Sequence, residues 1–146
     1  MNICTFNPAS IFCGSNNCAA IDLEGSILYI PNSYNDESFD LIEPKYLTNN
    51  EKAVDIACLS NFIYVLSSNG KLYISKKANT HKIDFQQVEQ FKNICIVQIS
   101  GILNHILVLT GDGKVYSKGT NSYGELGTLD RKDSLKKLYE ITSLNK

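Results

Sequence analysis

The chain has 146 residues, enough for one ordinary globular domain, and its hydrophobic (43%) and charged (20%) fractions are close to globular averages, which argues against disorder. Its formal net charge is −1, so it lacks the basic excess of proteins that hold a nucleic-acid backbone by charge. No stretch approaches the ~18 consecutive apolar residues of a membrane helix, so no membrane contact is predicted.

The first predicted element is a β-hairpin between residues 11 and 30. Its turn is Glu24-Gly25, where the glycine can take a positive φ at little cost. Ser26–Ile30 follows as a short strand rich in β-forming residues. Phe39–Pro44 then fills the place that an apolar segment occupies after each later hairpin.

The second hairpin carries the clearest turn. Phe62–Leu66 is apolar, too short for a helix, and leads into Asn69-Gly70, the strongest short hairpin signal available. Lys71–Ser75 is the returning strand. The segment that follows, Phe85–Phe91, has apolar residues at a spacing of three.

The third hairpin opens with a predicted strand at Val97–Gly101. It then joins His105–Leu109 to Lys114–Ser117 through an Asp112-Gly113 turn. Leu138–Leu144 repeats the spacing of the earlier apolar segment, 53 positions later.

Helical periodicity is weak throughout. Asp133–Tyr139 is the best helical candidate, and it is short. The sequence therefore predicts an all-β fold.

The three hairpins are copies of one repeat. Aligned without internal gaps, they share three columns of identical residues: Ile11/Ile56/Ile99, Asn16/Asn61/Asn104 and Gly25/Gly70/Gly113. The copies are offset by 45 and 43 residues, a period typical of repeat architectures. We therefore divide the chain into residues 1–53, 54–96 and 97–146, the last including the start of a next unit. Only two residues follow Leu144, where the pattern would continue with another strand.

The third copy resembles a repeat of the regulator-of-chromosome-condensation family. The matching residues are Gly101, His105, Leu109-Thr110, Asp112-Gly113, Val115-Tyr116, Gly119, Asn121 and Tyr123–Gly127. The resemblance implies a β-propeller of about seven four-stranded antiparallel blades. Three copies fall short of that number. We therefore expect a partial, about three-bladed propeller, an open arc whose apolar flanks need missing blades or another chain to close the ring.

Two positions depart from the family pattern. Lys118 stands where the family usually has tryptophan, and the chain contains no tryptophan at all. The tryptophan-based light sensing of the plant ultraviolet-B photoreceptor branch is therefore not expected. The histidine of the third copy, His105, is replaced by Asn17 and Phe62 in the other two copies.

No catalytic, cofactor or metal site is predicted. His105 and His81 are the only histidines, and neither is in register with a nucleophile; packing explains His105 better than catalysis. Gly111–Val115 lacks the spacing of a phosphate-binding loop, and a hairpin turn accounts for it. Asp112 fails the calcium-loop pattern.

The five cysteines, an odd number at irregular spacing without a CxxC pair, argue against a disulfide framework and a zinc module. They are Cys4, Cys13, Cys18, Cys58 and Cys95. Buried free thiols in a reducing compartment are the better interpretation. We therefore expect an intracellular protein, with nucleus and cytoplasm left open.

Tyr123 and Glu125 are the candidate partner-binding residues. They lie in a glycine-rich loop, where an aromatic ring beside a charge suits a protein interface. An alternative left open is that Tyr123 caps the core of its blade.

The function predicted from these observations is a non-enzymatic protein–protein interaction module within a larger propeller. The family's founding member implies an alternative, guanine-nucleotide exchange on a Ran-type small GTPase. A third possibility is a decayed or mispredicted gene fragment without a function of its own.

Overall fold

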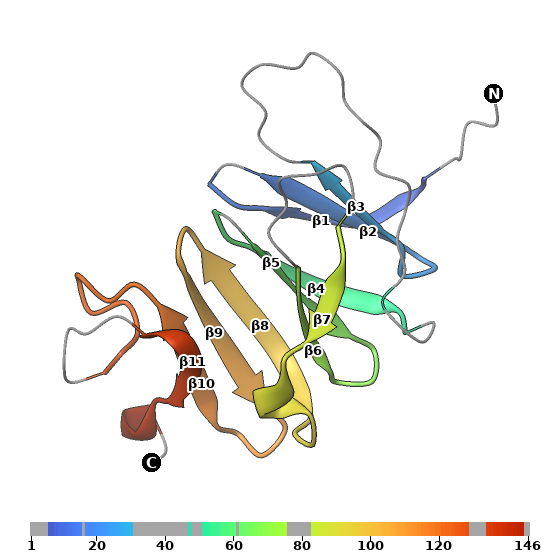
Figure 1. The fold of residues 1–146 in the computed structure, drawn as a ribbon. Coiled ribbons are helices and arrows are strands. Elements are labelled where there is room, and N and C mark those ends of the chain that lie inside the picture. Colours follow the sequence, from blue (N-terminus) through green and yellow to red (C-terminus); the bar gives the residue numbers. More distant parts are fainter. Residues whose placement is uncertain are drawn as a thin grey trace.

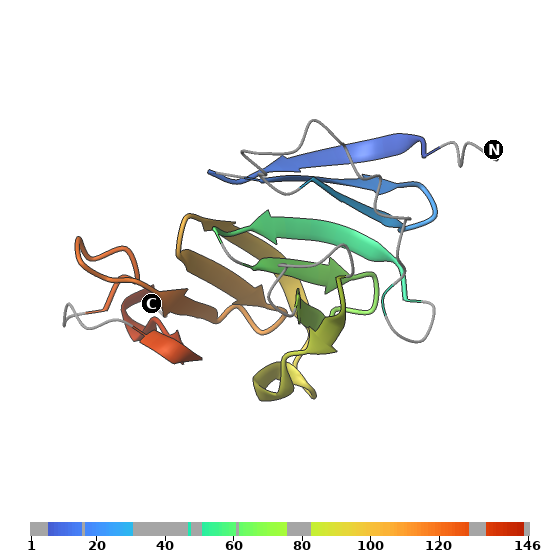
Figure 2. The same cartoon turned by 45° about the horizontal axis from the view of Figure 1, so that its top comes forward.

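A computed structural model describes residues 6–15, 17–30, 47, 51–60, 62–75, 83–128 and 134–144 (Figure 1). The described chain forms three separate antiparallel sheets, which follow one another along the sequence and do not close into a ring. The second sheet lies between the first and the third (Figure 2). The predicted all-β open arc of propeller blades is confirmed.

The strands of each sheet pair in chain order, so each sheet is a simple meander. The first sheet consists of β1 (Pro8–Cys13), β2 (Cys18–Asp22) and β3 (Ile27–Ile30). The segment Phe39–Pro44, in which a further apolar element was expected, lies outside the described residues, as do Asn16, Asn61, Cys4 and His81.

The second and third sheets have four strands each. The second consists of β4 (Ala53–Cys58), β5 (Ile63–Ser67), β6 (Leu72–Ser75) and β7 (Phe85–Gln87), followed by a 3₁₀ turn, η2 (Glu89–Phe91). The third consists of β8 (Ile96–Ile102), β9 (His105–Thr110), β10 (Val115–Gly119) and β11 (Ser134–Glu140), followed by η3 (Thr142–Leu144). Strand β11 includes most of Asp133–Tyr139, so this segment is a strand and not a helix. Its backbone pairs with β10 along the sheet edge, and this tertiary pairing overrides the weak local signal.

Each hairpin turns at the glycine that the repeat shares. Gly25, Gly70 and Gly113 have φ values of 80°, 73° and 85°, a region that side chains with a Cβ atom rarely adopt. The turn predictions are confirmed at all three positions.

The repeats also agree in strand register. The first strand of each sheet begins with the pairs Pro8–Asp22, Ala53–Ser67 and Ile96–Thr110, and each pair is followed by the same register shift. Such a shift is the signature of a β-bulge, which bends and twists the strand that carries it. Because the bulge recurs at one place in all three copies, the positions of the repeat are structurally equivalent.

Backbone hydrogen bonds join each sheet to the next at these same positions. The amide of Ala53 donates to the carbonyl of Gly25 (3.3 Å), and the amide of Ile96 donates to the carbonyl of Gly70 (2.8 Å). Each bond therefore links the start of one sheet to the shared turn glycine of the sheet before it. Pro8 holds the corresponding place in the first sheet and has no N–H to donate.

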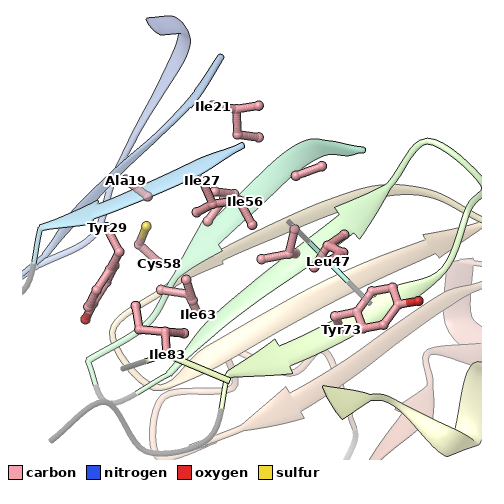
Figure 3. Close-up of a cluster of buried hydrophobic side chains, with 12 residues drawn as sticks. Ala19, Ile21, Ile27, Tyr29, Leu47, Ile56, Cys58, Ile63, Tyr73 and Ile83 are labelled. Carbon is pink, nitrogen blue, oxygen red and sulfur yellow. The ribbon is translucent and has the colours of Figure 1, made fainter. Parts of the chain in front are cut away.

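Apolar side chains fill both junctions between sheets. In the first junction, Ala19, Ile21 and Ile27 of the first sheet pack with Ile56 and Ile63 of the second (Figure 3). The second junction is built in the same way, with residues such as Tyr64, Leu66 and Leu72 facing Ile99, Ile106 and Val108. Each blade thus uses both of its faces when neighbours are present.

The prediction of buried thiols is only partly right. Cys58 is buried in the first junction, but Cys13, Cys18 and Cys95 are exposed, and all four are free. Cys13 and Cys18 face outward because no blade covers the outer side of the first sheet among the described residues. No helix in the described part of the chain has the length and apolar character needed to cross a membrane.

Candidate functional site

The glycine-rich loop that follows β10 is anchored to the neighbouring β8–β9 turn. Gly119, with φ of 133°, lies so close to this turn that an added Cβ atom would overlap the carbonyl oxygen of Asn104. The next residue, Thr120, donates its amide hydrogen to that same oxygen at 3.2 Å. Glycine at position 119 is therefore required for the close approach.

Asn121 organises the interior of the loop. Its Oδ1 atom accepts the amide hydrogen of Leu126 (3.0 Å), and its Nδ2 atom donates to Oγ1 of Thr128 (2.9 Å). The hydroxyl of Ser117 donates to the carbonyl of Leu126 (2.9 Å), and both Asn121 and Leu126 are fully buried. The loop therefore has a fixed polar core of its own.

Tyr123 and Glu125 lie together on the outside of this loop. The Tyr123 ring is 91% exposed, so it does not cap the core of its blade. Its amide donates to Oε2 of Glu125 (2.9 Å), and hydrogen bonds from the amides of Glu125 itself and of Tyr123 lower the pKa of the Glu125 carboxyl. The structure thus presents an exposed ring beside an anchored carboxylate. Their role in partner binding stays a prediction.

His105 starts β9 and is half-buried, paired with Gly119 across the sheet. It lies near enough to Glu125 to add a smaller, favourable charge effect on that carboxylate. Within the described residues, no group of three or more His, Cys, Asp or Glu side chains is placed to hold a metal ion.

A pocket that sequence analysis did not predict opens at the same end of the molecule. It has a volume of about 280 Å³ and lies between the second and third sheets. The lining residues include Phe62, Tyr64, Ile74, Leu103, Ile106 and Lys118. The departure from the family pattern at Lys118 was visible in the sequence. Its neighbours in the pocket come from three other strands and two turns, which no local pattern brings together.

Leu103 at the rim of this pocket has a backbone conformation unusual for its residue type. Its φ is 56°, in the left-handed region, and its side chain is 51% exposed. This conformation costs a residue with a Cβ atom roughly 1–2 kcal/mol. The carbonyl of Leu103 accepts a hydrogen bond from the amide of Ser60 (2.6 Å), which ties the strained turn to the second sheet.

Comparison with known families matches the third sheet and its loop. Residues 96–125 match the family described as "Regulator of chromosome condensation (RCC1) repeat". The ultraviolet-B receptor UVR8 of Arabidopsis thaliana is 34% identical over 89 residues, which cover 55% of this chain and 20% of the receptor. The chain thus spans about a fifth of that relative.

Solved propeller structures share the fold. Human WBSCR16 aligns with a TM-score of 0.69 at 18% identity, covering 96% of this chain and 41% of that structure. Prp20p from Saccharomyces cerevisiae aligns with a TM-score of 0.70 at 15% identity, covering 92% of this chain and 38% of that structure. At these identities the similarity is one of fold alone.

Proposed function

Because the chain is built from repeats of the regulator-of-chromosome-condensation type, we propose that it is a non-enzymatic protein–protein interaction module, with residues 1–53, 54–96 and 97–146 as its repeat units. Its two outer sheet faces take up neighbouring blades, and its loop end, with Tyr123 and Glu125, contacts a protein partner. The observation that carries this proposal is the exposure of the first sheet's outer face.

One repeat column measures this exposure directly. The column holds isoleucine in every copy, and Ile56 and Ile99 are each 5% exposed, whereas Ile11 is 77% exposed. Because the residue type is constant, the difference follows from the neighbours: among the described residues a preceding sheet packs on Ile56 and Ile99, but none packs on Ile11. An isoleucine that is exposed in a column buried in the other two copies supports a contact surface on this face.

The outer face of the third sheet supports the same conclusion. Leu107, Leu109 and Val115 are half-buried there, whereas the corresponding residues of the two preceding sheets are buried. Those corresponding residues are Ala19, Ile21 and Ile27 in the first sheet and Tyr64, Leu66 and Leu72 in the second. The carbonyl of Gly113 accepts no hydrogen bond from any described residue, although Gly25 and Gly70 each accept one from the next sheet. A further blade of the same repeat type would satisfy all of these groups.

Thiol labelling tests whether the outer face is covered in the cell. Cys13 and Cys18 lie on the exposed outer face of the first sheet, and Cys95, exposed at the end of the second repeat just before β8, is an internal control. We expect N-ethylmaleimide to modify Cys13 and Cys18 more slowly in intact cells than in the purified chain. For Cys95, the ratio of the labelling rate in cells to the rate in the purified chain should stay near one. Equal ratios for all three thiols would contradict the proposal.

A second candidate is guanine-nucleotide exchange on a Ran-type small GTPase. It is favoured by the fold similarity to Prp20p, whose structure is described together with its binding properties to Gsp1p and histones. A nucleotide-release assay with a panel of small GTPases tests it. If the chain stimulates nucleotide release from a GTPase, and substitutions on the outer sheet faces do not change this activity, the exchange function is supported in place of the interaction module. A nuclear or cytoplasmic location also stays a prediction.

A further inference from the structure

We propose that the pocket between the second and third sheets binds a carboxylate on a protein segment that carries an apolar side chain next to it, with Lys118 as the cation. This inference rests on the proposed interaction function and names the chemistry of the partner segment.

The walls of the pocket are apolar and come from both sheets. Tyr64 and Ile106 are buried at its inner side, whereas Phe62 and Leu103 are partly exposed at its mouth. Phe62 is 38% exposed and Leu103 is held in its strained turn, so two large apolar side chains border an opening instead of packing into the core. Apolar surface of this kind favours an apolar group on the ligand.

Two polar side chains of the pocket, Lys118 and Tyr64, are hydrogen-bond donors without an acceptor among the described residues. Lys118 is half-buried and makes no ion pair with any acidic residue in the described part of the chain, and no acidic side chain lines the pocket. The hydroxyl of Tyr64, a buried residue, makes no hydrogen bond to any residue that the structure describes. The Lys118 ammonium and the Tyr64 hydroxyl are both donors, and a carboxylate offers acceptor oxygens for both.

The protonation states of these groups agree with that geometry. Burial lowers the pKa of Lys118, which shows that the ammonium lies in surroundings that disfavour an isolated charge. Burial also raises the pKa of Tyr64 to about 12, so its hydroxyl stays protonated and able to donate. A bound carboxylate would relieve the unpaired charge of Lys118.

Two residues at the corresponding place between the first and second sheets differ from those that line the pocket. There Asn17, which takes the position of Phe62, donates from Nδ2 to the carbonyl of Leu59 (2.7 Å) and to the Tyr29 hydroxyl (3.2 Å). Tyr29 takes the position of Ile74. The side chains that line the pocket are therefore not constant across the repeats.

Ser75 shows how the repeat treats the Lys118 position elsewhere. Ser75 is buried, and its hydroxyl accepts the amide hydrogen of Ile63 at 2.9 Å. A short side chain satisfied within its own sheet is thus replaced in the third repeat by a long cation that has no partner among the described residues. The size of the pocket, about 280 Å³, is below the roughly 300–1,000 Å³ of sites for drug-sized ligands, so it suits a single residue of a peptide.

Three short peptides test the proposal with the full chain. N-acetyl-Gly-Phe carries a free terminal carboxylate, N-acetyl-Gly-Phe-amide lacks it, and N-acetyl-Phe-Asp-amide carries the acid in a side chain. Binding is followed by amide chemical shifts of the isotope-labelled chain at Phe62, Leu103 and Thr120. We expect at least one acidic peptide to bind about tenfold more tightly than the neutral amide, because a hydrogen bond to a charged group is stronger than one between neutral groups. The stronger of the two acidic peptides identifies the source of the carboxylate.

Variants assign the effect to one side chain. Lys118→Met should remove the preference for the acidic peptide and Lys118→Arg should retain most of it. Lys92→Met, which removes an exposed lysine outside the pocket, should leave the preference unchanged. Equal binding of acidic and neutral peptides, shifts at residues away from the pocket, or no binding of any peptide would each overturn the proposal. None of these results changes the labelling of Cys13 and Cys18, so this inference can fail while the proposed function stands.

Discussion

The carboxylate of Glu51 accepts a hydrogen bond from the ammonium of Lys71, which joins the segment before β4 to the turn before β6. Glu51 is buried, and it also accepts a hydrogen bond from the hydroxyl of Tyr73 (3.1 Å). Burial by itself would raise the pKa of Glu51, but hydrogen bonds from Lys71, Ser67 and Tyr73 together outweigh burial. The pKa therefore lies below its ordinary value of 4.5.

This arrangement predicts a loss of stability in acid. A carboxyl whose pKa is lower in the folded state stabilises the fold above its unfolded pKa, and the contribution disappears as the pH falls through the folded pKa. We expect the free energy of unfolding to decrease as the pH falls below the ordinary value of 4.5, and Glu51→Gln to flatten that decrease. Urea unfolding at a series of pH values measures both slopes. Glu24→Gln, at an exposed carboxylate, is the control and should leave the slope unchanged.

Two isoleucines of one repeat column should respond differently to the same substitution. Ile56→Ala removes a buried side chain and should lower the free energy of unfolding by about 2–5 kcal/mol. Ile11→Ala, at the exposed equivalent position, should change it by no more than about 0.5 kcal/mol. Chemical denaturation of the two variants makes the comparison. Similar losses would mean that a covering blade is present on the first sheet in solution.

The turn glycines provide a second matched pair. Gly25→Ala places a Cβ atom 2.7 Å from Cα of Lys52 and 2.9 Å from the amide nitrogen of Ala53, both backbone atoms of the next sheet. Gly113→Ala meets nothing within 4 Å among the described residues. In both variants the positive φ should lower the free energy of unfolding by roughly 1–2 kcal/mol. In Gly25→Ala the overlap with the next sheet should lower it by about a further 1–3 kcal/mol. Equal melting temperatures for the two variants would count against the packing of the first junction.

Asn121 should matter for the stability of its loop, and Tyr123 should not. Asn121→Ala removes the hydrogen bonds to Leu126 and Thr128 and leaves the buried amide of Leu126 without its acceptor, so we expect a loss of about 2–3 kcal/mol. Hydrogen exchange at the amides of residues 121–126 should accelerate in this variant. Tyr123→Ala, at an exposed ring, should stay within about 0.5 kcal/mol of the natural chain. If Tyr123→Ala is strongly destabilising, the ring is covered in solution.

Local sequence signals were sufficient for the hairpins and their alignment. The turn glycines are recognisable because a positive φ restricts residue choice, and apolar strands of fixed length flank them. The echo between Phe85 and Leu138 also corresponds to structure, because the amides of Val88 and Ile141, three residues later, donate to the carbonyls of Leu72 and Val115, which are equivalent positions. Repetition thus supplied the long-range information that a single copy lacks.

Features that depend on contacts between repeats were not predictable in this way. The pocket at Lys118 is lined by residues of two sheets, among them Ile74 and Ile106, which only the packing of the repeats brings together. In the sequence, Glu51 looks like an ordinary surface carboxylate. Its burial and its hydrogen bonds from Lys71 and Tyr73 become visible only in the folded chain. The exposure of Cys13 and Cys18 depends on whether a blade covers them. The residue type alone does not predict this.

A joint between two copies of this chain would place the third sheet of one copy against the first sheet of the other. At that joint Pro8 would stand where Ala53 and Ile96 stand inside the chain, and a proline has no amide hydrogen for the carbonyl of Gly113. An arc whose two ends fit each other is at risk of growing into an open-ended fibre, because each added copy presents a fresh end. Pro8 would leave such a joint without the backbone hydrogen bond that a turn glycine accepts at both internal junctions.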